Sequence, residues 1–387
     1  MAAYLHSLAT AVPAHAYDQE GILAMMKAWH GQDRRVSRLL SGMYLASAID
    51  RRHSVIDDFR PGSNGGFFYQ PAAGEADDHQ ATAGAVRDPA NMLGSFRNPT
   101  TAERNDVYAR EAGRLASCAA RKAMSSSGVL APGDVTHLIS MSCTGFYAPG
   151  VDFDVMRQLG LPQQVERYHL GFMGCYAALP AMRLARSICL AHSDAVVLIV
   201  SVELCTLHLQ AGTTSDELLA AAVFADGAAA AIVTARPPSD RPSLRLAAFN
   251  TAVVTDAEAD MAWTIGDTGF EMTLSNKIPR VVEGEVGAAL APLWRAADLA
   301  PEEIAAWAVH PGGRAILDSF ELALQLPRSA LVESREILRH YGNMSSATVL
   351  FVIERMLAAE ARPAGPITAV AFGPGLTVES ALLQPAA

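Results

Sequence analysis

The sequence predicts an α/β protein whose strands are covered by helices on both faces. Apolar segments of strand length recur along the chain, and segments of helix length separate them. Several of the strand-length segments are apolar at nearly every position, which is typical of strands buried on both faces. Regular alternation of such strands with helices indicates a layered α/β architecture.

Each expected element has a local reason. Thr101–Ser127 is rich in Ala and Arg and free of Pro, so we expect a helix there. Cys175–His192 is apolar at helical spacing, and Pro279–Leu290 begins with a Pro in the first turn, where a helix tolerates it. A further helix is expected over Ser345–Glu360. The expected strands are His137–Ser142, Ala195–Val202, Ala228–Val233, Ala306–Val309 and Ile367–Phe372.

The clearest internal boundary is the segment Arg236–Pro242, which reads RPPSDRP. Three prolines in seven residues cannot continue a helix or a central strand. We therefore predict two α/β units, residues 1–236 and residues 243–387. The polar, Gly-rich segment Pro61–Asn98 is expected to be a long loop or an inserted cap.

Composition excludes several classes of function. The 387 residues carry 30 basic and 40 acidic side chains, a net charge of −10, which argues against a protein that binds duplex nucleic acid. The five cysteines show no CxxC spacing, so we expect neither a disulfide framework nor a metal site. No signal peptide and no membrane-spanning segment are expected. These features together predict a soluble, cytoplasmic protein.

Cys175 is the first candidate for chemistry. It follows Gly174 and begins a strongly apolar helical segment, and the positive end of a helix dipole favours a thiolate. The alternative is a buried core cysteine, since free Cys is among the most buried residue types. That alternative is stronger for Cys118, Cys189 and Cys205, which have no preceding glycine. Cys143 ends a predicted strand, where it is placed to line a pocket.

Three further candidates follow predicted elements. His310 ends a strand and begins a Pro-Gly-Gly turn, and ligands gather at the carboxyl ends of strands in open sheets; a structural histidine is the alternative. Asn343 precedes a helix, where a cap is the local interpretation and a donor aimed into a site is the alternative. Gly373 and Gly375 flank Pro374 after a strand, in a loop that either approaches a bound molecule or simply turns.

Taken together, these segments resemble the type III polyketide synthases, the chalcone-synthase-like branch of the thiolase superfamily. The resemblance extends from about Leu5 to Leu383. Its most specific segments are ERYHLGFMGCYAA at Glu166–Ala178, VFADGAAAAIV at Val223–Val233, WAVHPGGRAILDSF at Trp307–Phe320, SREILRHYGNMSSATVLFVIE at Ser334–Glu354 and AFGPGLTVES at Ala371–Ser380.

The resemblance implies a duplicated five-layer α/β/α/β/α thiolase-like fold, a homodimer and a Cys-His-Asn site. It implies that Cys175 accepts an acyl starter as a thioester. His310 pairs with the thiolate and, with Asn343, stabilises the enolate that forms when a malonyl thioester loses CO2. That enolate attacks the acyl carbonyl in a decarboxylative Claisen condensation. The substrates implied are malonyl-CoA and acyl-CoA, and no cofactor is implied.

Some residues of the cavity wall are also implied. Phe224 matches one gatekeeper aromatic of the family, and Met272 stands where the second is usually aromatic. Trp263 stands at a position, commonly Gly in the plant enzymes, that controls cavity volume. His208 stands where plant enzymes often carry Thr, and Ala148 replaces a Met that reaches across the dimer interface in plant enzymes. Plain core packing is the alternative for these positions.

The basic residues that bind coenzyme A in the plant enzymes have no match in Leu39–Ala46. Arg34, Arg35 and Arg38 lie just upstream. They bind the phosphates of coenzyme A, or an acidic carrier protein that delivers acyl groups, or they form a solvated helix face.

The resemblance therefore predicts a polyketide synthase of secondary metabolism that makes an alkylpyrone, a resorcinol or a related aromatic product. One alternative is an enzyme like ketoacyl synthase III, which performs a single condensation. That branch usually carries Gln-Ala-Asn after its His, where this chain has Pro311-Gly312-Gly313. A non-catalytic member of the superfamily is a second alternative, which the intact Cys-His-Asn set opposes.

Overall fold

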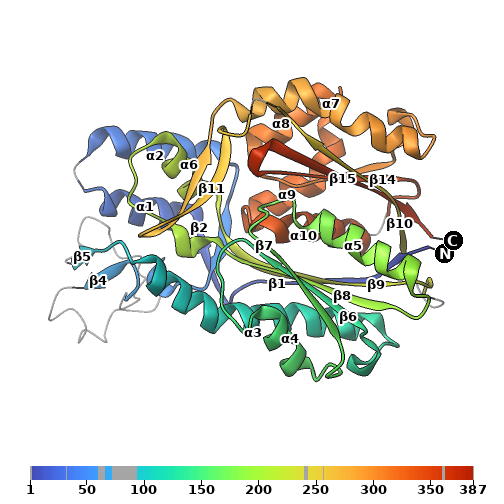
Figure 1. Ribbon diagram of the computed structural model, residues 1–387. Helices are drawn as coiled ribbons and strands as arrows, with labels where there is room; N and C mark the ends of the chain where they lie inside the picture. Colours follow the sequence, from blue (N-terminus) through green and yellow to red (C-terminus); the bar gives the residue numbers. More distant parts are fainter. Residues whose placement is uncertain are drawn as a thin grey trace.

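Five alternating layers of helices and strands make up the chain (Figure 1). The computed structural model describes residues 2–31, 33–59, 66–71, 94–238, 243–255, 257–359 and 362–386. The two outer layers hold α3 (Thr101–Ser127) with α4 (Val151–Leu159), and α7 (Ile278–Ala296) with α8 (Arg314–Ala323). The central helical layer contains α5 (Ala178–Ala191), α9 (Val332–Tyr341) and α10 (Thr348–Ala358). The predicted α/β/α/β/α architecture is confirmed.

The two strand layers belong to one mixed sheet of nine strands in the order β13-β14-β15-β10-β1-β9-β8-β6-β7. The first part of the chain contributes β1 (Tyr4–Ala11), β6 (His137–Ser142), β7 (Glu166–Gly171), β8 (Val196–Leu204) and β9 (Asp226–Thr234). The last part contributes β10 (Leu244–Val253), β13 (Ala306–Val309), β14 (Ile367–Gly373) and β15 (Thr377–Pro385). Within the sheet, the two parts meet where Tyr4 and Leu5 of β1 pair with Arg245 and Leu244 of β10.

The same pairing pattern occurs twice in this sheet. In the first part, β6 is parallel to β8, β8 is antiparallel to β9, and β9 is antiparallel to β1. In the second part, β13 is parallel to β14, β14 is antiparallel to β15, and β15 is antiparallel to β10. This repeat agrees with the prediction of two similar units, although their limits at residues 1–236 and 243–387 stay a prediction. Residues 239–242 of the predicted boundary lie outside the described residues.

The buried core follows from the apolar strands. Every residue of β6, β8 and β9 is buried, as their nearly continuous apolar sequences predict. The helices α5 and α10 contact strands of both halves, so they are covered on two sides. Helix α3 begins with a capping box between Thr100 and Glu103 and ends at Gly128, whose backbone is left-handed. Among the described residues, no helix combines the length and apolarity that crossing a bilayer requires.

Smaller elements lie beside the layers (Figure 1). They are the helices α1 (Gln19–Trp29), α2 (Arg34–Ala46) and α6 (Ser215–Val223), the hairpin of β11 (Met261–Gly266) and β12 (Gly269–Leu274), and the two-stranded pairs β2 (His15–Asp18) with β3 (Arg51–Ser54) and β4 (Tyr69–Pro71) with β5 (Gly94–Phe96). The β4–β5 pair falls within the predicted loop or cap Pro61–Asn98, most of which lies outside the described residues.

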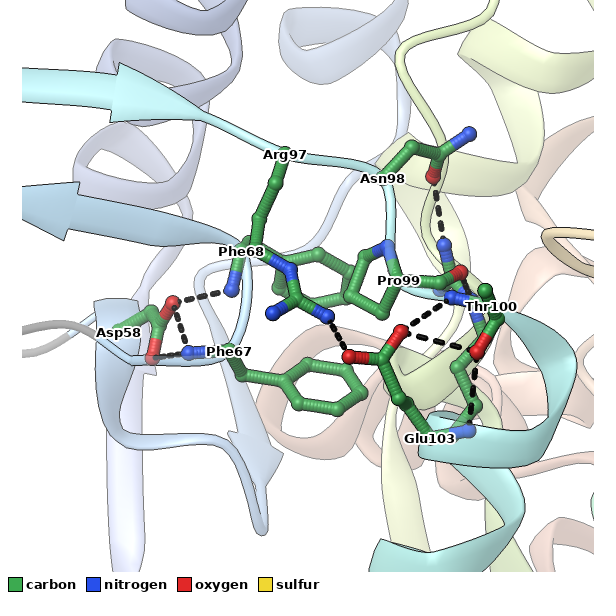
Figure 2. Close-up of polar contacts among 9 residues, drawn as sticks. Asp58, Phe67, Phe68, Arg97, Asn98, Pro99, Thr100 and Glu103 are labelled. Atoms are coloured by element: carbon green, nitrogen blue, oxygen red, sulfur yellow. Dashed lines mark hydrogen bonds and ion pairs between the residues drawn. The ribbon is translucent and has the colours of Figure 1, made fainter.

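The segment before α3 is anchored by polar contacts (Figure 2). The carboxylate of Asp58 accepts hydrogen bonds from the backbone N–H groups of Phe67 and Phe68, and Arg97 pairs with Glu103 in the first turn of α3. The buried Arg104 then donates to the carbonyl oxygens of Leu207 and Leu209. These last bonds hold the backbone on both sides of His208.

Candidate active site

Cys175, His310 and Asn343 line one cavity of about 330 Å³. Cys175 lies in the turn between β7 and α5, His310 follows β13 directly, and Asn343 lies between α9 and α10. His310 is 135 residues from Cys175 in the chain and 33 from Asn343, so only the folded sheet brings the three together. Buried residues, including His310 and Asn343, line the inner end of the cavity, and exposed residues line its opening.

Cys175 sits ahead of its helix rather than in the first turn. The helix begins at Ala178, three residues later than predicted. The chain leaves β7 through two left-handed residues, Phe172 with φ of 58° and Gly174 with φ of 87°, and this geometry requires a turn before the helix can start. Because the field of a helix dipole is strong only near the first turn, the dipole supports a thiolate at Cys175 less than the sequence suggested.

Burial favours the neutral forms of both Cys175 and His310. Removal from water raises the pKa of the Cys175 thiol to about 12, although hydrogen bonds from the side chains of Ser345 and Asn343 oppose this shift. Burial lowers the pKa of His310 to about 3. Both shifts disfavour the thiolate–imidazolium pair expected from the residue types. A thiol that attacks from its neutral form must lose a proton as it does so.

His310 has unused hydrogen-bonding capacity. Its side chain is 1% exposed, and neither ring nitrogen has a hydrogen-bond partner among the described residues. Its backbone is fixed, because the N–H of His310 donates to the carbonyl oxygen of Val370 at 2.8 Å. A buried polar group without a partner costs free energy. A ring held in this way is available to a ligand in the cavity.

Asn343 lines the cavity but is not the helix cap that its sequence position suggested, since Met344 caps the following 3-10 turn and Ala347 caps α10. Its side-chain oxygen accepts the backbone N–H of Ser345 at 2.9 Å, and its amide nitrogen donates to the carbonyl oxygen of Gly312 at 3.1 Å. Its backbone pairs with Val223 and Ala225, on either side of Phe224. The side-chain oxygen therefore closes a turn ahead of the helix, and the bond to Gly312 leaves one amide hydrogen for the cavity.

A buried carboxylate lies behind the thiols. Glu203, at 0% exposure, accepts hydrogen bonds from the Cys143 backbone N–H at 2.9 Å, from the Thr144 hydroxyl at 2.9 Å and from the Ser346 hydroxyl. Burial raises the pKa of Glu203, and these hydrogen bonds oppose the shift. Cys143, whose sulfur lies 3.1 Å from the Ser345 hydroxyl oxygen, lines the cavity beside Cys175.

The Gly-Pro-Gly loop packs against the turn of the nucleophile. A Cβ at Gly373 would lie 2.4 Å from Cδ1 of Tyr176, and a Cβ at Gly174 would lie 2.5 Å from Cδ of Pro374. Pro374 lines the cavity, whereas Gly373 and Gly375 do not. The contribution of Gly373 visible here is close packing, which positions the backbone of Cys175.

Phe224, Trp263 and Met272 separate this cavity from a second one of about 270 Å³, since all three line both. Trp263 and Met272 pair across the β11–β12 hairpin, and the Trp263 indole N–H donates to the carbonyl oxygen of Cys143 at 2.7 Å. The carbonyl of Phe224 accepts a hydrogen bond from the buried Arg52 at 2.7 Å. These three side chains are therefore held in place from different elements.

His208 lines the second cavity as a fully paired group. The backbone N–H of Phe270 donates to its Nδ1 at 3.0 Å, so the ring proton must be on Nε2, which lies 2.8 Å from the carbonyl oxygen of Thr144. The ring stacks on Phe270 at 4.1 Å between centroids, and burial lowers its pKa to about 3. This arrangement makes His208 a neutral wall residue rather than an acid or base.

Two cavity residues were missed from the sequence. Cys205 was expected in the core, yet it lines both cavities. Arg314, the first residue of α8, lines the first cavity. The arginines of α2 do not, since Arg34, Arg35 and Arg38 are exposed near the start of that helix. The cavity is lined instead by residues at the end of α2 and just after it, Met43, Ala46 and Ser47. The sequence around Cys205 and Arg314 does not show that they line a cavity, because this depends on which distant segments pack against them. Among the described residues, no group of three or more His, Cys, Asp or Glu side chains is placed to hold a metal.

Comparisons with known proteins agree with this geometry. A family model described as "Chalcone and stilbene synthases, N-terminal domain" matches residues 86–237, and the corresponding C-terminal domain matches residues 245–386. The structure of PKS-I from the brown alga Ectocarpus siliculosus is similar, with a TM-score of 0.87 and 27% identity over 100% of this chain and 98% of that chain. The C-terminal type III polyketide synthase domain of Steely1, from a type I/III hybrid of Dictyostelium, has a TM-score of 0.86 and 25% identity over 99% of both chains.

Proposed function

The chain belongs to the chalcone-synthase-like type III polyketide synthases, and from this membership we propose that it builds a polyketide on Cys175 from an acyl starter and malonyl units. The family uses acyl-CoA and malonyl-CoA as substrates. The observation that carries the proposal is the convergence of Cys175, His310 and Asn343 on one cavity, where neither ring nitrogen of His310 has a partner in the described part of the chain.

In the first step, the sulfur of Cys175 attacks the starter thioester. Because burial holds the thiol and the imidazole neutral, we propose that the proton passes from Cys175 to His310 as the C–S bond forms. The leaving thiolate takes that proton when the tetrahedral intermediate collapses. This returns His310 to its neutral form and leaves an acyl-Cys175 thioester.

In the second step, a malonyl thioester replaces the departed thiol. Loss of CO2 leaves an electron pair on the α-carbon as an enolate, whose oxygen accepts hydrogen bonds from the N–H groups of His310 and Asn343. Two such donors in a water-poor cavity stabilise developing negative charge strongly. The enolate carbon then attacks the acyl carbonyl and the bond to Cys175 breaks. The Cys175 thiolate takes up one proton from solvent, which balances the loss of neutral CO2 from a carboxylate.

We propose more than one extension, giving an alkylpyrone, a resorcinol or a related aromatic product. The second cavity supports this, since it offers space beyond the wall that Phe224, Trp263 and Met272 share with the first cavity. The alternative is a single condensation, as in ketoacyl synthase III, with acyl chains bound to a carrier protein.

The test is incubation of the purified protein with malonyl-CoA and a panel of acyl-CoA starters, followed by mass spectrometry. Products with two or more added C2 units are expected, and the Cys175→Ala variant should form none. Products with only one added unit would favour the alternative. Absence of CO2 release and of any product with every starter, free or carrier-bound, would contradict both.

We also propose a homodimer joined along β7. This strand is the last of the sheet on its side, and Tyr168 on it and Phe146 beside it are 39% and 38% exposed. The backbone groups on the free side of an edge strand invite pairing with a second copy. Light scattering coupled to size-exclusion chromatography should give twice the chain mass of 41.0 kDa, and a monomer would contradict the proposal.

A further inference from the structure

The first cavity has a distinct mouth. Among the residues that line it, Ala46, Asn276, Arg314 and Ala315 are exposed, whereas His310, Asn343 and Cys143 are buried. The cavity therefore leads from the surface to the thiol of Cys175. A substrate that reacts at the buried end must leave the rest of its length at this mouth.

Arg314 is the cationic residue of the mouth. It is exposed, and no acidic side chain among the described residues lies within 4.0 Å of its guanidinium. Asp318, one turn further along α8, is already paired with Arg335 at 2.6 Å. An arginine without an acidic partner presents its full fork of donors to an incoming anion.

The local backbone favours an anion at the same place. Arg314 is the first residue of α8, and the preceding Gly313 offers no side-chain acceptor for the first N–H groups of the helix. The positive end of the helix dipole therefore adds to the charge of the arginine. His310 is four residues earlier in the chain, so its Cα and that of Arg314 are within about 14 Å.

Resting on the proposed function, we propose that Arg314 binds the 4′-phosphate of the pantetheine arm that carries the acyl and malonyl thioesters. The arm is an unbranched chain, so with its thioester at Cys175 it must follow the cavity outward and place its phosphate near the mouth. Coenzyme A and the prosthetic group of a carrier protein share this phosphate. The phosphate is therefore recognised whichever of the two delivers the substrate.

Charge elsewhere supports this position. The second cavity is lined by Asp216, Glu217 and Glu271, which repel a phosphate. Arg38 is eight residues from Ala46 along α2, about 12 Å beyond the mouth, so the arginines of α2 are too far along the helix to replace Arg314 at the first phosphate.

The experiment compares three hexanoyl thioesters as probes of acyl transfer: hexanoyl-CoA, hexanoyl-4′-phosphopantetheine and hexanoyl-pantetheine. Acylation of Cys175 is followed by intact-protein mass spectrometry without malonyl-CoA. The Arg314→Ala variant should lose about five- to tenfold in the second-order rate constant with the first two probes and nothing with the third, which has no phosphate. Added salt should reduce the difference in rate constant between the wild type and Arg314→Ala with the two probes that carry the phosphate.

Arg328→Ala is the matched control, because Arg328 is an exposed arginine that does not line either cavity. It should acylate like the wild type with all three probes. An equal loss of Arg314→Ala with all three probes would overturn the proposal in favour of a structural role. A loss with hexanoyl-CoA alone would also overturn the proposal, because Arg314 would then contact a phosphate that hexanoyl-4′-phosphopantetheine does not have. Failure of the wild type to acylate with any probe would instead remove the proposed function, and this inference with it.

Discussion

The indole N–H of Trp263 donates a 2.7 Å hydrogen bond to the carbonyl oxygen of Cys143. This bond ties the β11–β12 hairpin to the end of β6, across the boundary between the two cavities. At the next residue, the carbonyl of Thr144 lies 2.8 Å from Nε2 of His208. Two ring N–H groups therefore hold the successive carbonyls of Cys143 and Thr144, which fixes this part of the cavity wall.

Substitution of Trp263 should separate the effect of this bond from the effect of indole volume. Trp263→Phe keeps a ring but loses the donor, which should cost about 1 kcal/mol of stability with little change in products. Trp263→Ala joins the two cavities and should shift products toward longer chains. Urea unfolding and mass spectrometry of the products measure the two effects. An unchanged product profile in Trp263→Ala would contradict a role for the indole in limiting chain length.

His310 should make the protein less stable in acid. The unfolded chain binds a proton on this residue near pH 6.5, whereas burial lowers the folded pKa to about 3. Between these values the unfolded state holds more protons, so stability falls as the pH falls. From pH 7.5 to pH 5, this residue should account for about 2 kcal/mol of lost stability. In urea unfolding, His310→Gln should lose about 2 kcal/mol less stability than the wild type over this pH range. If stability fell equally with pH in both proteins, the lowered pKa of His310 would be refuted.

Alkylation of Cys175 by iodoacetamide should keep accelerating above pH 9. Only the thiolate reacts, and burial raises the pKa of this thiol to about 12, so the thiolate fraction still grows tenfold per pH unit at pH 9. Peptide mass spectrometry follows the rate, with the exposed Cys118 as an internal reference. A rate that levels off below pH 8 would instead indicate the thiolate–imidazolium pair expected from sequence.

Asn343→Asp should separate the turn contact of Asn343 from its role as a hydrogen-bond donor. Aspartate keeps the acceptor for the Ser345 N–H but has no N–H to offer an enolate. CO2 release from malonyl-CoA should therefore fall about 100-fold, while acylation of Cys175 changes less. Asn276→Ala, at the exposed mouth, is the control amide. Wild-type CO2 release from Asn343→Asp would exclude Asn343 as the donor.

Gly373→Ala should disturb the nucleophile without touching the cavity. The added Cβ would lie 2.4 Å from Tyr176, so the turn that carries Cys175 must shift. We expect about 1–3 kcal/mol of destabilisation and at least tenfold slower acylation. Gly284→Ala in α7 is the control, since no atom outside its helix lies within 4 Å of the new Cβ. Normal acylation by a folded Gly373→Ala protein would disprove the positioning role.

The sequence predicted the helices and strands well, because apolar pattern and capping residues lie within the segments that they define. His137–Ser142, Ala306–Val309 and Thr101–Ser127 have the bounds that apolar pattern and capping residues indicate. The start of α5 was predicted at Cys175 instead of Ala178, because apolar periodicity continues through a turn that only the backbone reveals. The helix expected over Ser345–Glu360 begins as a 3-10 turn, and α10 proper starts at Thr348.

The sequence by itself determined the layered α/β class, the elements, and the motifs that contain Cys175, His310 and Asn343. Only the tertiary structure decided that Cys205 and Arg314 line a cavity, that His208 is a neutral, fully bonded wall residue, and that burial disfavours an ion pair between Cys175 and His310. The reason is physical. Periodicity and turn preference depend on neighbours in the chain, whereas desolvation and hydrogen-bond partners depend on segments that are far apart in the chain.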